Sequence, residues 1–164
     1  MSAVPDLLAP VVGFRAWRIV DRRLLSPHIP VRWEGRTMQA SCYPANRRLT
    51  FGRGWLSAPH ASPDPECKCG IYAYHRPGVR SWFGEFEWVE GVVACWGRLE
   101  AHADGLRAER ARVEGLVTPG DGEASRRGAV EVVAARLGVP VVARAQLEDF
   151  AAQVGAPLPP ALLP

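Results

Sequence analysis

The sequence has no long hydrophobic run and very little lysine. No apolar stretch approaches the roughly 18 residues that a membrane-spanning helix requires, so we predict no membrane insertion. The N-terminus lacks a basic start and carries Asp6 ahead of its short apolar piece, which argues against a signal peptide and favours a cytoplasmic location. Lys68 is the only lysine among 20 basic residues, a skew typical of translation from a GC-rich genome.

Motifs of the common enzyme classes are also missing. The chain has no P-loop, no dinucleotide-binding glycine pattern at a strand-helix junction, no serine nucleophile elbow and no His-Glu-x-x-His. A Cys-His nucleophile pair stays open as an alternative, although each cysteine has a simpler explanation. The sequence therefore favours a protein that is not an enzyme.

Positive charge is not concentrated in any one part of the chain. The net charge is +3, and pairs such as Arg22-Arg23 and Arg126-Arg127 are far apart, with acidic residues among most of the other arginines. A nucleic-acid-binding domain usually gathers its positive charge on one face. A nucleic-acid-binding accessory role through scattered arginines is therefore only an alternative.

Residues 1–118 predict a mainly antiparallel β domain. A chain of 164 residues is long enough to bury a core. Segments rich in β-branched and aromatic residues, bounded by Pro, Gly and Asp, predict strands. Residues 106–117 are ambiguous, since Arg-Ala-Glu-Arg-Ala-Arg favours a helix while the flanking Leu and Val favour a strand, and we predict a strand. The other predicted strands are residues 11–20, 24–25, 31–33, 37–42, 70–75 and 88–102.

Residues 119–164 predict a C-terminal helical pair and a proline-rich tail. Apolar residues recur at helical spacing in residues 124–137, and Gly138 just past them is typical of a helix C-cap. A second amphipathic helix is predicted over residues 145–154, and we expect both helices to pack on the β domain or on a partner. The predicted fold class is therefore α+β, with a long zinc-anchored loop in the β domain and a two-helix appendage.

Four residues in the first half predict a Cys₃His metal site: Cys42, His60, Cys67 and Cys69. The last three lie at the end of an irregular segment, residues 43–66, which needs an anchor in a compact domain. Cys67 and Cys69 are too close in sequence to form a disulfide readily, and a reducing cytoplasm disfavours one. Thiolate and imidazole ligands suit Zn²⁺, and a closed set of four marks a structural ion because no position is left for water or substrate.

Three alternatives to this site stay open. In the first, the thiols are ordinary buried side chains. In the second, Cys95 competes as the fourth ligand, although its place among apolar strand residues favours a core thiol. In the third, His60 points away and an open zinc site serves a hydrolase-type enzyme with Asp64 or Glu66 as general base. The Pro-Asp-Pro-Glu sequence favours turns for these two acidic residues instead.

An aromatic run in residues 81–88 suggests a ligand pocket. Large rings beside a glycine can line a site for a flat or cationic ligand. The alternative, which we favour, is that Trp88 and one or two other rings cap the core of the sheet. The candidate pocket residues are Trp82, Phe83, Phe86 and Trp88.

Five short motifs, spread over most of the chain, carry a resemblance. They are Gly-x-Arg-x-Trp at residues 13–17, the Cys, His and Cys-x-Cys-Gly-Ile-Tyr-Ala core from Cys42 to Ala73, Trp-Gly-Arg at 96–98, Gly-x-Arg-Ala-Glu at 105–109 and Leu-Gly-Val-Pro-Val-Val at 137–142. With these motifs the sequence resembles a family of small Cys- and His-containing proteins from GC-rich, actinobacterial-type bacteria. The resemblance implies a metal-supported fold with Cys95 outside the ligand set, and it implies no activity.

We therefore predict a non-enzymatic, zinc-stabilised binding or adaptor module that acts through contacts with a protein partner. The reason is that the sequence contains a closed set of metal ligands and lacks a catalytic constellation. Nucleic-acid binding and a zinc-dependent hydrolase-type activity are the alternatives.

Overall fold

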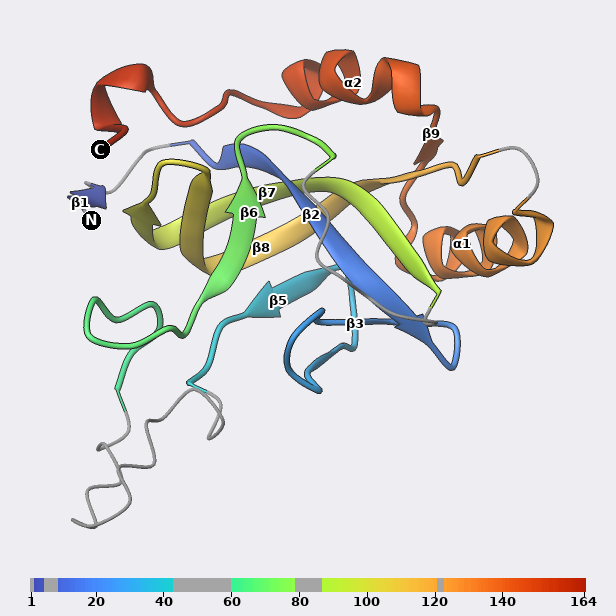
Figure 1. The fold of residues 1–164 in the computed structure, drawn as a ribbon, viewed down its shortest axis with the longest axis horizontal. Coiled ribbons are helices and arrows are strands. Elements are labelled where there is room, and N and C mark those ends of the chain that lie inside the picture. The colour runs from blue at the N-terminus through green and yellow to red at the C-terminus, as the bar shows by residue number, and fades with distance from the viewer. Residues whose placement is uncertain (1, 5–8, 43–59, 79–86, 121–122) are drawn as a thin grey trace, which may run out of the picture.

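The chain has an α+β fold, with one mostly antiparallel sheet and two helices near the C-terminus (Figure 1), as the sequence predicts. The computed structural model describes residues 2–4, 9–42, 60–78, 87–120 and 123–164. The helices are α1 (Ala124–Leu137) and α2 (Leu147–Val154), and short 3₁₀ turns span Arg144–Gln146 and Pro160–Leu162. The strands are β1 (Ser2–Val4), β2 (Val11–Val20), β3 (Arg23–Leu25), β4 (Arg32–Trp33), β5 (Thr37–Gln39), β6 (Ile71–Tyr74), β7 (Trp88–Ala101), β8 (Gly105–Val117) and β9 (Val141–Val142).

Four of these strands close on one another in a ring. β2 pairs with β7, β7 with β8, β8 with β6, and β6 returns to β2 where Phe14 meets Tyr74, all antiparallel. β3 and β4 extend the sheet beyond β2, while β1 pairs with β7 and β5 with β8. Among the named strands, β9 alone pairs in parallel, with the end of β8. Closure gives the ring strands one face that points into a shared interior.

β2 is buried on both faces because each face packs into a different cluster. Alternate residues of a strand share a face. The interior face contributes to the main core cluster, which includes Val11, Trp17, Trp33, Val93, Cys95, Val113, Leu116, Val130 and Val133. The opposite face contributes to the α2 cluster, which consists of Val12, Phe14, Val92, Val117, Leu147 and Ala151.

Both helices pack on the sheet, as these clusters show. α1 contributes Val130 and Val133 to the main core cluster, and α2 covers the outer face of the sheet along the top of Figure 1. α1 ends as predicted at Gly138, which adopts a left-handed conformation with a φ of 65°. The domain boundary between residues 118 and 119 stays a prediction. Neither α1 nor α2 has the length and apolar character needed to cross a membrane.

The predicted elements are present, with changes mainly at their ends. The ambiguous segment forms strand β8, because pairing with β7 along most of its length outweighs its local helix propensity. The strand predicted over residues 37–42 ends earlier, at Gln39, and the second helix begins at Leu147 after a 3₁₀ turn. Strand β1 was not predicted. Of the long loop predicted over residues 43–66, the described part begins at His60.

Candidate metal centre

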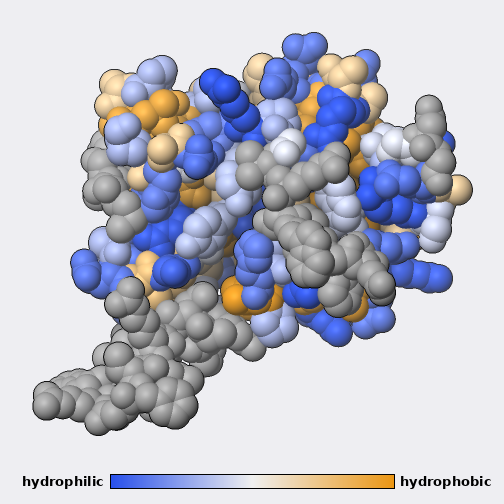
Figure 2. Space-filling model, in the orientation of Figure 1, coloured by the Kyte–Doolittle hydropathy of each residue, from blue (hydrophilic) through white to orange (hydrophobic). Residues whose placement is uncertain are grey.

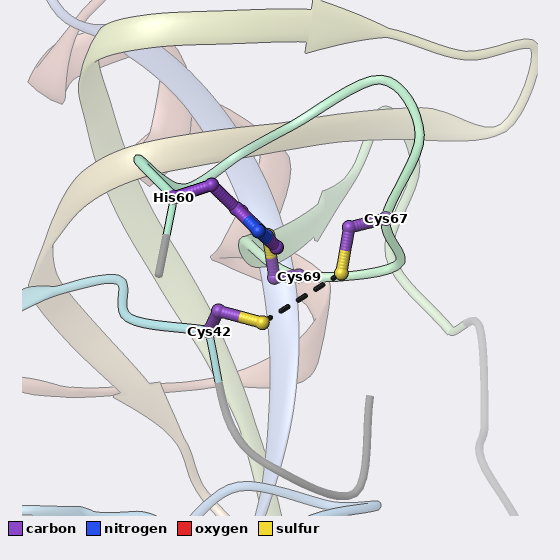
Figure 3. Close-up of side chains that lie close together, drawn as sticks. All are labelled: Cys42, His60, Cys67 and Cys69. Carbon is purple, nitrogen blue, oxygen red and sulfur yellow. Dashed lines mark hydrogen bonds between the residues drawn. The ribbon is translucent and has the colours of Figure 1, made fainter. Parts of the chain in front are cut away.

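The side chains of Cys42, His60, Cys67 and Cys69 converge on one point (Figure 3). Their ligand atoms, three sulfurs and one imidazole nitrogen, all lie within 4.8 Å of one another. The Sγ atoms of Cys42 and Cys67 are 3.7 Å apart, and Cys69 Sγ lies 3.5 Å from His60 Nε2. The four residues that the sequence predicts as ligands are therefore close enough to hold one metal ion.

The Cys42–Cys67 distance of 3.7 Å and the Cys69–His60 distance of 3.5 Å match the edges of a tetrahedron around a single ion. With metal–sulfur bonds of about 2.3 Å and metal–nitrogen bonds of about 2.0 Å, the edges are roughly 3.8 Å between two sulfurs and roughly 3.5 Å between sulfur and nitrogen. A disulfide would bring two sulfurs to about 2.05 Å, and none of the four cysteines forms one. The side chains are thus arranged to share an ion without bonding to each other.

The cluster joins two segments that are distant in the sequence. Cys42 follows β5, which pairs with β8 and is extended by a hydrogen bond of 2.6 Å from the Ala40 N–H to the Glu109 carbonyl. The other three ligands lie in residues 60–69, here called the metal loop, which leads directly into β6. Because β6 also pairs with β8, an ion at this point would tie together two neighbours of the same strand.

Gly70 sets the exit of the metal loop into β6. Its φ is +128°, a conformation that residues with a side chain rarely adopt. A Cβ atom there would lie 3.0 Å from the Cβ of Arg107 and 3.2 Å from that of Pro63. Both the backbone conformation and the lack of space for a side chain therefore explain why a glycine follows Cys69 in the Cys-x-Cys-Gly motif.

The acidic residues of the metal loop hold its backbone turns. Asp64 Oδ1 accepts a hydrogen bond of 2.8 Å from the Glu66 N–H, and the Asp64 carbonyl accepts one of 3.0 Å from the Cys67 N–H. An aspartate that accepts from the amide two residues on forms an Asx turn. This geometry agrees with the interpretation of Asp64 and Glu66 as turn residues.

Arg107 of β8 supports the metal loop, a role that the sequence analysis missed. Its guanidinium pairs with Glu100 of β7, and the two side chains are only 3% and 4% exposed. The same guanidinium donates to the carbonyls of Cys67, Cys69 and Asp64, the last two at 3.0 and 3.4 Å. Arg107 therefore fixes the backbone around two of the thiols and places a positive charge beside groups that bind metals as anions.

The pKa values of Cys67 and Cys69, the two thiols of the Cys-x-Cys pair, shift in opposite directions. Burial raises the pKa of Cys69, and the neighbouring Cys67 raises it further. Burial also opposes ionisation of Cys67, but hydrogen bonds from the Cys69 backbone and from the side chains of Cys42 and His60 outweigh it and lower its pKa. Cys67 is thus the more readily ionised of the pair, and a bound cation would favour the thiolate form of every cysteine in the cluster.

Cys95 lies in the main core cluster and takes no part in the group of four. It faces Val11 on β2 and Ala111 on β8 in the interior of the sheet. Burial raises the pKa of its thiol to about 12. Cys95 is therefore a neutral core side chain, which removes the main competitor for the fourth ligand position.

One member of the predicted aromatic pocket lies in the described residues. Trp82, Phe83 and Phe86 lie outside them, so the pocket stays a prediction. Trp88 begins β7 and is partly buried, and the Arg126 guanidinium of α1 lies 4.7 Å from its ring centroid. This contact docks α1 on the sheet, in agreement with a packing role for Trp88.

Arg15 of β2 is a second functional candidate that the sequence analysis missed. It is 6% exposed, and its guanidinium donates to the Tyr72 carbonyl at 2.6 Å and to Ser26 Oγ at 3.2 Å. Its Cζ lies 5.5 Å from the ring centroid of Trp33 and 5.8 Å from that of Trp17. Each such cation–π contact contributes about 1–2 kcal/mol, whereas desolvating an ion costs several kcal/mol.

No carboxylate of the described residues forms a salt bridge with Arg15. Burial lowers the pKa of the guanidinium to about 10, which shows how strongly the site resists its charge. The burial of Arg15 could have been predicted from the sequence. Strand alternation places Arg15 on the same face as Val11 and Trp17, so an arginine was predictable on the core side of β2.

No family model matches the sequence, and neither a curated protein nor a solved structure matches the chain.

Proposed function

We propose that the protein is a zinc-stabilised binding module in which the ion is structural. The convergence of Cys42, His60, Cys67 and Cys69 within 4.8 Å carries this proposal. Three sulfurs and one nitrogen form a donor set that suits Zn²⁺ and not the hard cations Mg²⁺ or Ca²⁺. Four protein ligands complete a tetrahedron, so no coordination position is left for a water or a substrate. We keep the prediction of a cytoplasmic location because thiols stay reduced there.

The ion would stabilise the metal loop locally, whereas the rest of the fold would be stabilised by its hydrophobic core. The ring strands already bury a continuous core, whereas the metal loop has no regular secondary structure apart from turns. Zinc would hold this loop to the end of β5. Binding energy at such a site becomes folding energy for the segment it closes.

We further propose that the binding partner is a protein. Several arginines form ion pairs within the chain: Arg36 and Arg112 both pair with Glu114, and Arg144 pairs with Glu90. Such pairing reduces the positive charge available to phosphates. The face in Figure 2 presents hydrophobic residues as separate patches among hydrophilic ones, which suits local protein contacts.

Metal analysis tests the structural part of the proposal. We expect purified protein to contain about one zinc per chain, and less than about a tenth of an equivalent of any metal would rule the site out. Chelation should lower the melting temperature and speed amide exchange in the metal loop. A catalytic zinc would behave differently, since Cys67→Ser would then abolish a hydrolytic activity while leaving the stability unchanged.

The salt dependence of binding tests the class of partner. Recovery of a protein partner from lysate should change little between about 0.05 and 0.5 M salt and should survive nuclease treatment. Nucleic-acid binding would instead fall steeply and linearly on a logarithmic salt scale. That outcome would replace the protein partner with the nucleic-acid alternative.

A further inference from the structure

A pocket of about 290 Å³ opens beside the metal loop and reaches Arg15. Its walls come from β2, the turn between β3 and β4, the end of β5 and the start of β6. Its volume lies just below the range of roughly 300–1,000 Å³ that small-molecule sites occupy. The pocket is therefore large enough for a compact ligand of small-metabolite size.

The pocket wall is largely apolar and in part rigid. Trp33 is buried and packs edge-on against Trp17, with ring centroids 5.5 Å apart. Fixed rings of this kind favour the apolar body of an organic ligand. Besides Trp33, the apolar side chains that line the pocket include Ile29, Val31, Met38 and Ile71.

Arg15 supplies the one deeply buried charge among the described residues of the lining. Two of its N–H groups hold the Tyr72 carbonyl and Ser26 Oγ, while its buried Nε has no hydrogen-bond partner among the described residues. A guanidinium has more donors than these two bonds use. The cation–π contacts with Trp17 and Trp33 recover only part of its lost hydration energy, so the described residues leave the positive charge of Arg15 incompletely compensated.

We propose that this pocket binds a small organic carboxylate, with the carboxylate on Arg15 and the apolar body against Trp33. The planar guanidinium fork matches the geometry of a carboxylate, and the pair is strongest where water is excluded. Phosphate fits less well, because phosphate sites bring together several cations or backbone N–H groups, whereas the other basic residues of the lining, His28 and Lys68, are exposed. A compact inorganic anion would also leave the apolar walls unfilled.

This inference depends on the proposed function in one respect, since the metal ligands border the pocket. Ser41 lines the pocket next to Cys42, and Lys68 and Gly70 line it on either side of Cys69. An ion bound by these cysteines would fix the wall that follows β5 relative to the wall that precedes β6. We therefore expect metal removal to weaken carboxylate binding, whereas loss of carboxylate binding leaves the metal in place.

The test uses the full chain with its metal content measured in the same sample. Benzoate and hexanoate are titrated by isothermal calorimetry beside their matched amides, benzamide and hexanamide, and beside inorganic phosphate. We expect the carboxylates to bind with Kd values of about 1 mM or tighter and the amides to bind at least about tenfold more weakly. Equal binding of the amides, saturable binding of phosphate alone, or no saturation by either carboxylate at about 10 mM would overturn the proposal.

A matched pair of variants locates the site. Arg15→Met removes the charge and keeps most of the side-chain length, and Arg76→Met removes an exposed arginine outside the pocket. We expect the first to weaken carboxylate binding at least about tenfold and the second to leave it unchanged. If Arg15→Met does not fold, the comparison of carboxylate with amide binding on the unchanged protein still tests whether the pocket binds a carboxylate.

The metal measurement separates the two proposals. A chain that holds about one zinc yet binds no carboxylate overturns the pocket inference alone. A folded chain that holds no metal overturns the proposed function, whatever the ligands do.

Discussion

Arg107 and Glu100 face each other across β8 and β7 in a buried ion pair, and the same Arg107 guanidinium donates to the carbonyls of Cys67 and Cys69. One cross-strand pair thus connects the sheet to the loop that carries three of the four candidate ligands. A buried ion pair is costly to break because the remaining charge loses its partner. The geometry of the candidate metal centre therefore depends on the sheet beneath it as well as on the four candidate ligands.

Arg107→Met is expected to lower the free energy of unfolding by about 3–5 kcal/mol, because Glu100 would stay buried without its partner. Urea denaturation measures this change, and a zinc-competition assay on the same protein should show weaker metal binding. The control is Arg110→Met, which removes an exposed arginine 3.6 Å from Glu109 and should cost less than about 1 kcal/mol. Equal losses for the two variants would contradict the proposed role of Arg107.

Cys67→Ser is expected to abolish stoichiometric metal binding, whereas Cys95→Ala should retain about one equivalent. The reason is that Cys67 lies in the cluster of four, whereas Cys95 lies in the main core cluster. Elemental analysis of both purified variants checks this expectation. Loss of metal in Cys95→Ala with its fold intact would show that the ligand set has been assigned wrongly.

Cys95 is expected to make the protein less stable at alkaline pH. Its pKa is about 12 in the folded chain against an ordinary value of 9.0. Below pH 9 the thiol is neutral in the folded and in the unfolded chain, so the contribution of Cys95 to stability is fully present there. As the pH rises from 9 towards 12, only the unfolded chain ionises, so stability falls, by about 1 kcal/mol per pH unit at first.

Loss of the Arg15 proton changes the stability in the opposite direction at alkaline pH, and it limits the test to pH values up to about 10. Its pKa falls from 12.5 to about 10 on burial, so the folded chain loses that proton first and gains stability from about pH 10 upwards. Urea denaturation at about pH 8, 9 and 10 should therefore show a smaller fall in stability for Cys95→Ala than for the unchanged chain. Parallel pH profiles would refute this assignment.

Leu147→Ala is expected to cost about 2–4 kcal/mol, because Leu147 is fully buried in the α2 cluster and its loss would leave a cavity. Thermal and urea unfolding measure the loss. Val132→Ala serves as the control, since Val132 on α1 is 44% exposed and should change stability by less than about 0.5 kcal/mol. An unchanged stability in Leu147→Ala would mean that α2 is a detachable appendage.

Features that depend on local chemistry were predictable. β2 and α1 follow from residue type and periodicity, and Gly138 follows from the need for a left-handed residue at the helix end. The four candidate metal ligands were predictable for the same reason, because sulfur and imidazole are metal donors by residue type, whatever the fold around them. β8 was harder to predict, since its local propensity pointed to a helix and only its pairing with β7 stabilises the strand.

The sequence by itself determined the types of element and the four residues able to bind a metal. Only the tertiary structure decided that four strands close into a ring, that Arg107 supports the metal loop and that Arg15 faces a pocket without a carboxylate partner among the described residues. The physical reason is distance along the chain. Propensity and ligand chemistry act over a few residues, whereas burial and charge compensation depend on which distant strands come together.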